Sequence, residues 1–205
     1  MSWIREAAED EPGGAVAAAF EKDRATRGYV ANLTRLLANR PAVLDAWIGL
    51  NGAIKASMSP RRYELATLAA ALRLRSTYCA LAHGSILAEH HVGAEAVREA
   101  AEGHDTVQLS PIDRAVMDLA DKVAAGAADM TESDLTELRD LGLDDGEILD
   151  VILAASARCF FSSVLDSTGT QADAVFQDLD PALRDALTVG RPIAAPDPVG
   201  RHLAT

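Results

Sequence analysis

Helix-start signals recur along the chain, and each opens a stretch in which apolar residues repeat with helical period. Serine precedes proline at 59–60 and at 110–111, and aspartate precedes proline at 180–181. Serine and aspartate suit the N-cap and proline suits the first helical position, so these pairs predict helix N-termini. No alternating apolar–polar run and no hairpin signal competes with them. We therefore expect an all-α fold.

The expected helices follow from these start signals, from apolar periodicity and from glycine stops. We expect a single helical domain over 1–190, with a first half at about 29–104 and a related second half at about 105–190. Prolines at 192, 196 and 198 argue for an extended tail over 191–205. The first expected helix covers 15–39, with a division at Gly28. The next begins at Pro41 and carries an apolar stripe (Val43, Leu44, Trp47, Ile48, Leu50). Further helices are expected from Pro60, from 77 to 90 or 91, at 94–102, 112–125, about 131–141 and 144–164, and a short one from Pro181.

Composition narrows the class of protein. The 205 residues are 49% hydrophobic but only 4% aromatic, which suits closely packed helices rich in alanine and leucine. A formal net charge of −12 argues against a nucleic-acid partner or an anionic membrane surface. No apolar run reaches the roughly 20 residues that span a bilayer, and no signal-peptide pattern opens the chain. With two distant cysteines and no disulfide pattern, we expect a cytoplasmic protein.

The stretch 64–83, ELATLAAALRLRSTYCALAH, carries the residues best suited to chemistry. Cys79 and His83 are four positions apart, which places a thiol and a base on one helix face. Glu64 lies fifteen positions before the cysteine, and one unbroken helix would hold the two about 22 Å apart. The three side chains can meet only if the chain folds back between them.

The sequence offers such a break near residue 75. Arg73 and Arg75 suit a helix C-terminus, and Ser76 suits the N-cap of the next helix. Cys79 would then lie in the first turn, where free N–H groups and the helix dipole favour thiolate over thiol. The pattern predicts an activated cysteine, with Glu64 brought in from the preceding helix.

Each residue also has a structural interpretation. Cys79 and His83 could be core residues, and Glu64 could lie on a solvated face. A metal site is a second possibility, because Cys79, His83 and His90 lie near one helix face with Glu64 as a fourth ligand. Metal ligands usually converge from several elements, so we favour the thiol and expect no metal and no cofactor. Four arginines are expected as surface or subunit-contact charges, and the stripe around Trp47 as core or oligomer interface; the arginines are Arg61, Arg62, Arg73 and Arg75.

The stretch 64–87, ELATLAAALRLRSTYCALAHGSIL, resembles the AhpD-like alkylhydroperoxidase group of the carboxymuconolactone decarboxylase superfamily, in its uncharacterised peroxidase-related branch. The family pattern is a glutamate followed twelve positions later by C-x-x-C-x-x-x-H. Glu64, Ser76, Cys79 and His83 occupy these four positions. The downstream segment containing LGLDDGEI also resembles the second half of such proteins, so the resemblance covers about residues 29–178.

The resemblance implies an all-helical subunit that assembles into trimers or hexamers, and a peroxide-reducing cysteine at Cys79. It also implies that Glu64 acts through water and His83 as a proton relay to the thiol. Two supporting positions depart from the family: Ser76 replaces the first cysteine, and Tyr78 stands where the founding enzyme has a second histidine. A sulfenic acid on Cys79 would then need an external thiol, another subunit or Cys159, which we interpret as a structural cysteine.

Three functions follow from these observations. The leading one is a peroxidase-like oxidoreductase that acts on hydroperoxides or another small molecule through Cys79, with an external thiol reductant. The alternative is a carboxymuconolactone decarboxylase-like enzyme in which Glu64 and His83 move protons on a small carboxylated substrate. The third is a non-catalytic helical homo-oligomer.

Overall fold

The computed structural model describes residues 2–8, 14–103 and 106–196, and within them the chain is helical and contains no strand. The expected all-α fold is confirmed. Short non-α turns lie at Ala88–Val92, which is a π-helix, and at Ala127–Asp129 and Ala174–Asp178, which are 3-10 helices. The α-helices are α1 (Ala15–Arg27), α2 (Asn32–Leu37), α3 (Pro41–Ser57), α4 (Pro60–Arg73), α5 (Thr77–Leu87), α6 (Ala94–Ala101), α7 (Pro111–Gly126), α8 (Ser133–Asp140), α9 (Asp145–Ser167) and α10 (Pro181–Leu187).

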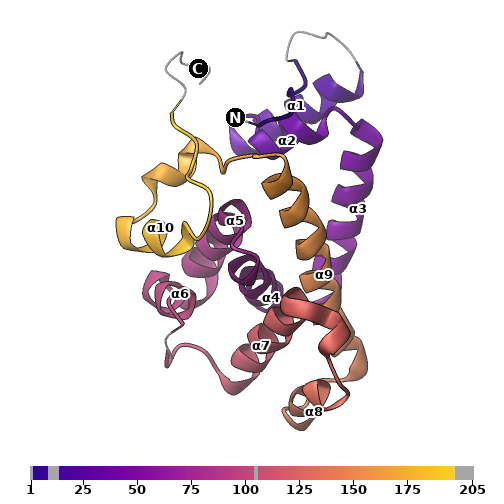
Figure 1. Cartoon of the computed structure of the whole chain (residues 1–205), viewed down its shortest axis with the longest axis vertical. Helices are drawn as coiled ribbons and strands as arrows, with labels where there is room; N and C mark the ends of the chain where they lie inside the picture. Colours follow the sequence, from indigo (N-terminus) through magenta and orange to yellow (C-terminus); the bar gives the residue numbers. More distant parts are fainter. Residues whose placement is uncertain (1, 9–13, 104–105, 197–205) are drawn as a thin grey trace.

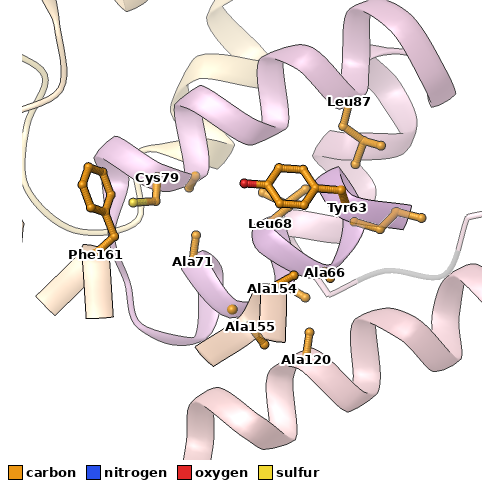
Figure 2. Packing of buried hydrophobic residues seen from close by; sticks show 14 of the residues in the cluster. Tyr63, Ala66, Leu68, Ala71, Cys79, Leu87, Ala120, Ala154, Ala155 and Phe161 are labelled. Carbon is orange, nitrogen blue, oxygen red and sulfur yellow. The ribbon is translucent and has the colours of Figure 1, made fainter. Parts of the chain in front are cut away.

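Helix α4 is the centre of the molecule and packs against α5, α7 and α9 (Figure 1). Helix α3 lies along α9, whereas α6 and α10 cover α5. Small side chains let the central helices approach closely, as Ala66, Ala120, Ala154 and Ala155 show in Figure 2. The abundance of alanine in the sequence therefore reflects close helix crossings.

Predicted caps are present at the N-termini of α4, α7, α9 and α10. Ser59 accepts a hydrogen bond from the N–H of Arg62 and opens α4. Ser110 and Asp113 form a capping box at the start of α7, and Asp144 forms another at the start of α9. Because each cap is made within four residues, the sequence locates it without knowledge of the tertiary fold.

The division expected at Gly28 is present, and the apolar stripe of α3 is partly buried and partly exposed. Gly28, at φ 81°, ends α1, but three further residues separate it from α2. The apolar stripe of α3 is only partly core: Leu44 and Trp47 are buried, whereas Val43, Ile48 and Leu50 are 46%, 42% and 54% exposed. Helix α3 packs against α9, α2 and α1, and among the described residues these neighbours leave part of its apolar stripe uncovered.

The predicted break between α4 and α5 is confirmed at 74–76, where Arg75 adopts a left-handed conformation with φ 54°. Residues 188–194 cross this turn and form what we call the C-terminal strap. The N–H of Gly190 donates to Thr77 Oγ1 at 2.8 Å, and Arg75 Nε donates to the Val189 carbonyl at 3.2 Å. Residues 191–196 form no helix, as expected for the tail, and 197–205 lie outside the described residues.

Helix α9 is long and apolar enough to cross a membrane by length and composition, a property that the sequence-based expectation overlooked. Half of its most apolar 18-residue stretch is buried within the fold, and the helix packs against α3, α4 and α7. These contacts are those of a core helix, for which a long apolar sequence is ordinary.

Candidate functional site

Glu64 is buried inside the helical core although it carries a carboxylate. It lies in the second turn of α4 and is 1% exposed. Its Oε2 lies 2.6 Å from His83 Nδ1 on α5, and its Oε1 accepts a hydrogen bond from Lys55 Nζ of α3 at 3.3 Å. The break at residue 75 thus brings carboxylate and imidazole together. A buried carboxylate needs such partners, and here two neighbouring helices, α3 and α5, supply them.

The surroundings of Glu64 and His83 determine which of the two carries a charge at neutral pH. Burial, and after it the Arg158 cation, lower the pKa of His83 to about 4 against the opposing effect of Glu64. Burial alone would raise the pKa of Glu64, but the hydrogen bond with His83 and the Lys55 charge outweigh it, and the pKa lies below its usual value. At neutral pH we therefore assign an anionic Glu64 and a neutral His83 that donates through Nδ1. The Nε2 atom of His83 is left with a lone pair and can accept a proton.

Cys79 is the third residue of α5 and is 1% exposed. Figure 2 shows its sulfur pointing toward the side of Phe161 from α9, with Ala71 of α4 nearby. His83 follows it by one turn on α5, but no hydrogen bond joins the two side chains in the described structure. The structure thus pairs Glu64 with His83, while the thiol has a different partner.

That partner is Arg158 of α9, whose Nη1 donates to Cys79 Sγ at 3.5 Å. Arg158 is 3% exposed, and its Nε has no hydrogen-bond partner among the described residues. Its guanidinium carbon lies 5.9 Å from the ring centre of Trp47 and 5.7 Å from that of Phe161. These two rings are stacked with centroids 4.3 Å apart. The Arg158 cation thus contacts the Cys79 thiol and lies beside the two aromatic rings.

The supporting positions Ser76 and Tyr78 have different surroundings in the structure. Ser76 occupies the N-cap of α5, but its side chain makes no capping hydrogen bond, which corrects the expected cap. The Tyr78 hydroxyl donates to Asp173, a buried carboxylate that also accepts from the N–H of Asn32. Tyr78 therefore anchors the segment after α9 to the start of α2 and is not part of a relay.

The remaining candidates lie apart from this group. Within 2–8, 14–103 and 106–196, no three His, Cys, Asp or Glu side chains gather as a metal site would require. His90 lies in the exposed π-helical turn. Three of the arginines expected at the surface or at subunit contacts form ion pairs within the subunit: Arg61 with Asp113, Arg62 with Glu147 and Arg73 with Asp121.

Sequence reasoning missed Arg158 and Lys55. Buried residues of α9 recur at helical spacing, as Ile148, Val151, Ala155 and Leu165 show, and Arg158 falls on the same stripe. An arginine in an apolar stripe is a signal, because a cation is rarely buried without a partner. Lys55 gives no such signal, because its exposed stem resembles that of any surface lysine.

Comparisons with known proteins agree with this architecture. Residues 41–122 match the Carboxymuconolactone decarboxylase family. The fold is similar to the AhpD core of an uncharacterised peroxidase-related protein from Ralstonia eutropha JMP134 (TM-score 0.76, 19% identity, covering 93% of this chain and 98% of that chain). It is also similar to an uncharacterised peroxidase-related protein from Silicibacter sp. TM1040 (TM-score 0.70, 19% identity, 82% and 90%).

An enzyme of different chemistry shares the fold as well. The debrominase Bmp8 in complex with 2,3,4-tribromopyrrole has a TM-score of 0.69 and 14% identity, covering 90% of this chain and 95% of that chain. No curated protein sequence matches the chain significantly. At these identities the solved structures establish the fold, and they show that this fold serves more than one function.

Proposed function

Residues 41–122 match the Carboxymuconolactone decarboxylase family and the fold is similar to that of AhpD-like peroxidase-related proteins; on this basis we propose that the chain is a thiol peroxidase-like oxidoreductase that reduces hydroperoxides through Cys79. The observation that carries the proposal is the buried Glu64–His83 hydrogen bond, formed one helical turn from a buried cysteine at the start of α5. A thiol, a neutral imidazole and a carboxylate on adjacent helices are the parts that a thiol peroxidase needs.

The proposed reaction begins with removal of the Cys79 proton. Anionic Glu64 holds the Nδ1–H of His83, which leaves Nε2 to take that proton; since no hydrogen bond joins His83 to Cys79, we route the proton through one water. The thiolate attacks the outer oxygen of R–O–OH, an S–O bond forms and the O–O bond breaks. The leaving alkoxide takes the proton from His83 and departs as an alcohol, while Cys79 becomes a sulfenic acid.

The sulfenic acid must then be reduced by two electrons. Ser76, at the position of the first family cysteine, cannot form a disulfide. Cys159 follows Arg158 on α9 and is turned by about 100° around the helix axis, away from the face that carries the guanidinium to Cys79. We therefore propose an external thiol reductant: two thiols release water, regenerate Cys79 and leave as a disulfide.

The test is to trap the oxidised cysteine. The protein is treated with hydrogen peroxide or cumene hydroperoxide in the presence of dimedone, and the labelled residue is identified by mass spectrometry. Cys159→Ser is expected to label like the parent, Cys79→Ser to lose the label, and Glu64→Gln to label more slowly. Absence of label on Cys79, under conditions that oxidise a control thiol, would refute the proposal.

A second function is favoured by one observation, namely that the Glu64–His83 pair is complete without Cys79. Such a pair could move a proton on a small carboxylated substrate, as in a decarboxylase-type enzyme. Full activity of Cys79→Ser on a lactone or keto acid, with loss of activity in Glu64→Gln, would favour this function over peroxide reduction.

We also propose that the chain forms a homo-oligomer, a trimer or a hexamer. Apolar side chains are exposed on α3 and α9, which pack together in the subunit. Size-exclusion chromatography with light scattering should give a trimer or larger for the parent and a smaller species for the Leu149→Glu, Leu153→Glu double variant. Val175→Glu, a matched exposed site on another element, is the control. The exposed residues are Val43, Ile48, Leu50, Leu149, Leu153 and Phe160.

A further inference from the structure

Arg158 is a buried cation that has no carboxylate partner among the described residues. Its side chain projects from α9 into the core, where its Nη1 donates to Cys79 Sγ at 3.5 Å. Trp47 and Phe161 lie beside the guanidinium, and its Nε makes no hydrogen bond. In the described structure the sulfur is thus its one hydrogen-bond acceptor.

Burial of a charge is unfavourable unless an opposite charge or strong hydrogen bonds replace the lost water. The aromatic faces of Trp47 and Phe161 offset part of this cost. A neutral thiol adds little, because its sulfur is a weak acceptor. A thiolate, in contrast, would provide the missing opposite charge at hydrogen-bond distance.

A count of charges around the site leads to the same conclusion. The anion Glu64 from α4 is matched by the cation Lys55 from α3, at 3.3 Å. His83 from α5 is neutral at physiological pH, because burial and the nearby Arg158 lower its pKa to about 4. One positive charge, on Arg158, is left without a match in this set. The charges balance when Cys79 is an anion.

We propose that Arg158 is the counter-ion of the Cys79 thiolate and hence a further catalytic residue, since it touches the reacting sulfur. This inference rests on the proposed function in that it assigns a role at the same site. Arg158 also has opposite effects on the two neighbouring groups: it favours the anionic form of the Cys79 sulfur and the neutral form of the His83 imidazole. When His83 takes the proton of Cys79, Arg158 stabilises the thiolate that forms.

The experiment measures the thiolate itself. In a Cys159→Ser background only Cys79 contributes, so absorbance at 240 nm across pH 4 to 10 reports its ionisation, with Cys79→Ser as the blank. Arg158→Met removes the buried charge and keeps a long apolar chain, whereas Arg158→Lys keeps the charge. Arg73→Met, in which an exposed arginine is changed in the same way, is the matched control.

At pH 7 we expect Arg158→Met to lower the ratio of thiolate to thiol about tenfold or more, because a neighbouring opposite charge typically shifts such an equilibrium by that factor. Arg158→Lys should fall between this variant and the parent, and Arg73→Met should match the parent. Alkylation by iodoacetamide should change in the same order at pH 7 and converge at high pH, where all variants are ionised. Circular dichroism checks folding; if Arg158→Met does not fold, Arg158→Gln replaces it.

Coincident ionisation curves for the parent and the charge-removing variant would overturn the inference. The outcome is independent of peroxide chemistry. A charge-dependent thiolate that dimedone never labels after peroxide would leave Arg158 in its role and remove the proposed function. If dimedone labels Cys79 normally after peroxide but ionisation is unchanged in Arg158→Met, the proposed function stands and the role of Arg158 is refuted.

Discussion

The buried imidazole of His83 should make the folded state sensitive to mild acid. In the folded protein burial, and after it the Arg158 cation, lowers the pKa of His83 from 6.5 to about 4. In the unfolded chain the same side chain titrates near its ordinary value. Between these two values the unfolded state binds more protons than the folded state, so the free energy of unfolding falls as pH falls through this window.

The size of the effect follows from the shift. A difference of about 2.5 pKa units corresponds to about 3 kcal/mol, of which about 2 kcal/mol is lost between pH 7 and pH 5. This upper part of the window is the informative one, because most carboxylates remain ionised there. The measurement is urea unfolding at several pH values for the parent and for His83→Gln, in which an amide can still donate to Glu64.

We expect the parent to lose about 2 kcal/mol more than His83→Gln on going from pH 7 to pH 5. His90→Gln, an exposed change in the π-helical turn, should follow the parent. Parallel curves for the parent and His83→Gln would show that His83 has no depressed titration in the folded state. The assignment of a neutral, proton-accepting imidazole would then be wrong.

Three further substitutions test the packing that holds the site. Gly84→Ala would place a Cβ 2.7 Å from Leu187 Cδ1 in the core, and we expect a loss of about 2 kcal/mol in the free energy of unfolding that Leu187→Ala relieves in the double variant. Gly190→Ala would place a Cβ 2.1 Å from the Arg75 carbonyl oxygen, so the C-terminal strap should detach and become sensitive to limited proteolysis. Ser110→Ala removes a cap of α7 and should cost about 1 kcal/mol by urea unfolding.

The fold could be predicted to a large extent because its signals are local. The caps at Ser59 and Ser110 and the glycine stops depend on neighbouring residues only, and the structure contains them. The exposure of Val43 and Leu50 could not be predicted in the same way. Periodicity shows that one side of α3 is apolar, but the number of neighbours that cover it depends on the tertiary arrangement and on any further subunit.

The candidate site could be predicted in part for the same reason. The spacing of Cys79 and His83 follows from helix geometry, and the break that returns Glu64 to them has a cap signal at Ser76. Arg158 could not be placed from the sequence, because its contact with Cys79 joins residues 79 positions apart. The same limitation applies to Lys55, whose role depends on how α3 crosses α4.

The turn at residue 75 shows why a local motif does not by itself fix the geometry of the site. Arg75 has a side chain and yet adopts φ 54°, a conformation that residues other than glycine rarely take. Its Nε donates to the Val189 carbonyl, and Gly190 donates to Thr77 immediately beyond the turn. Only glycine fits at 190, because a Cβ there would meet the Arg75 carbonyl. The short motif thus sets the spacing of Glu64, Cys79 and His83, while a strap more than a hundred residues downstream stabilises the turn that brings them together.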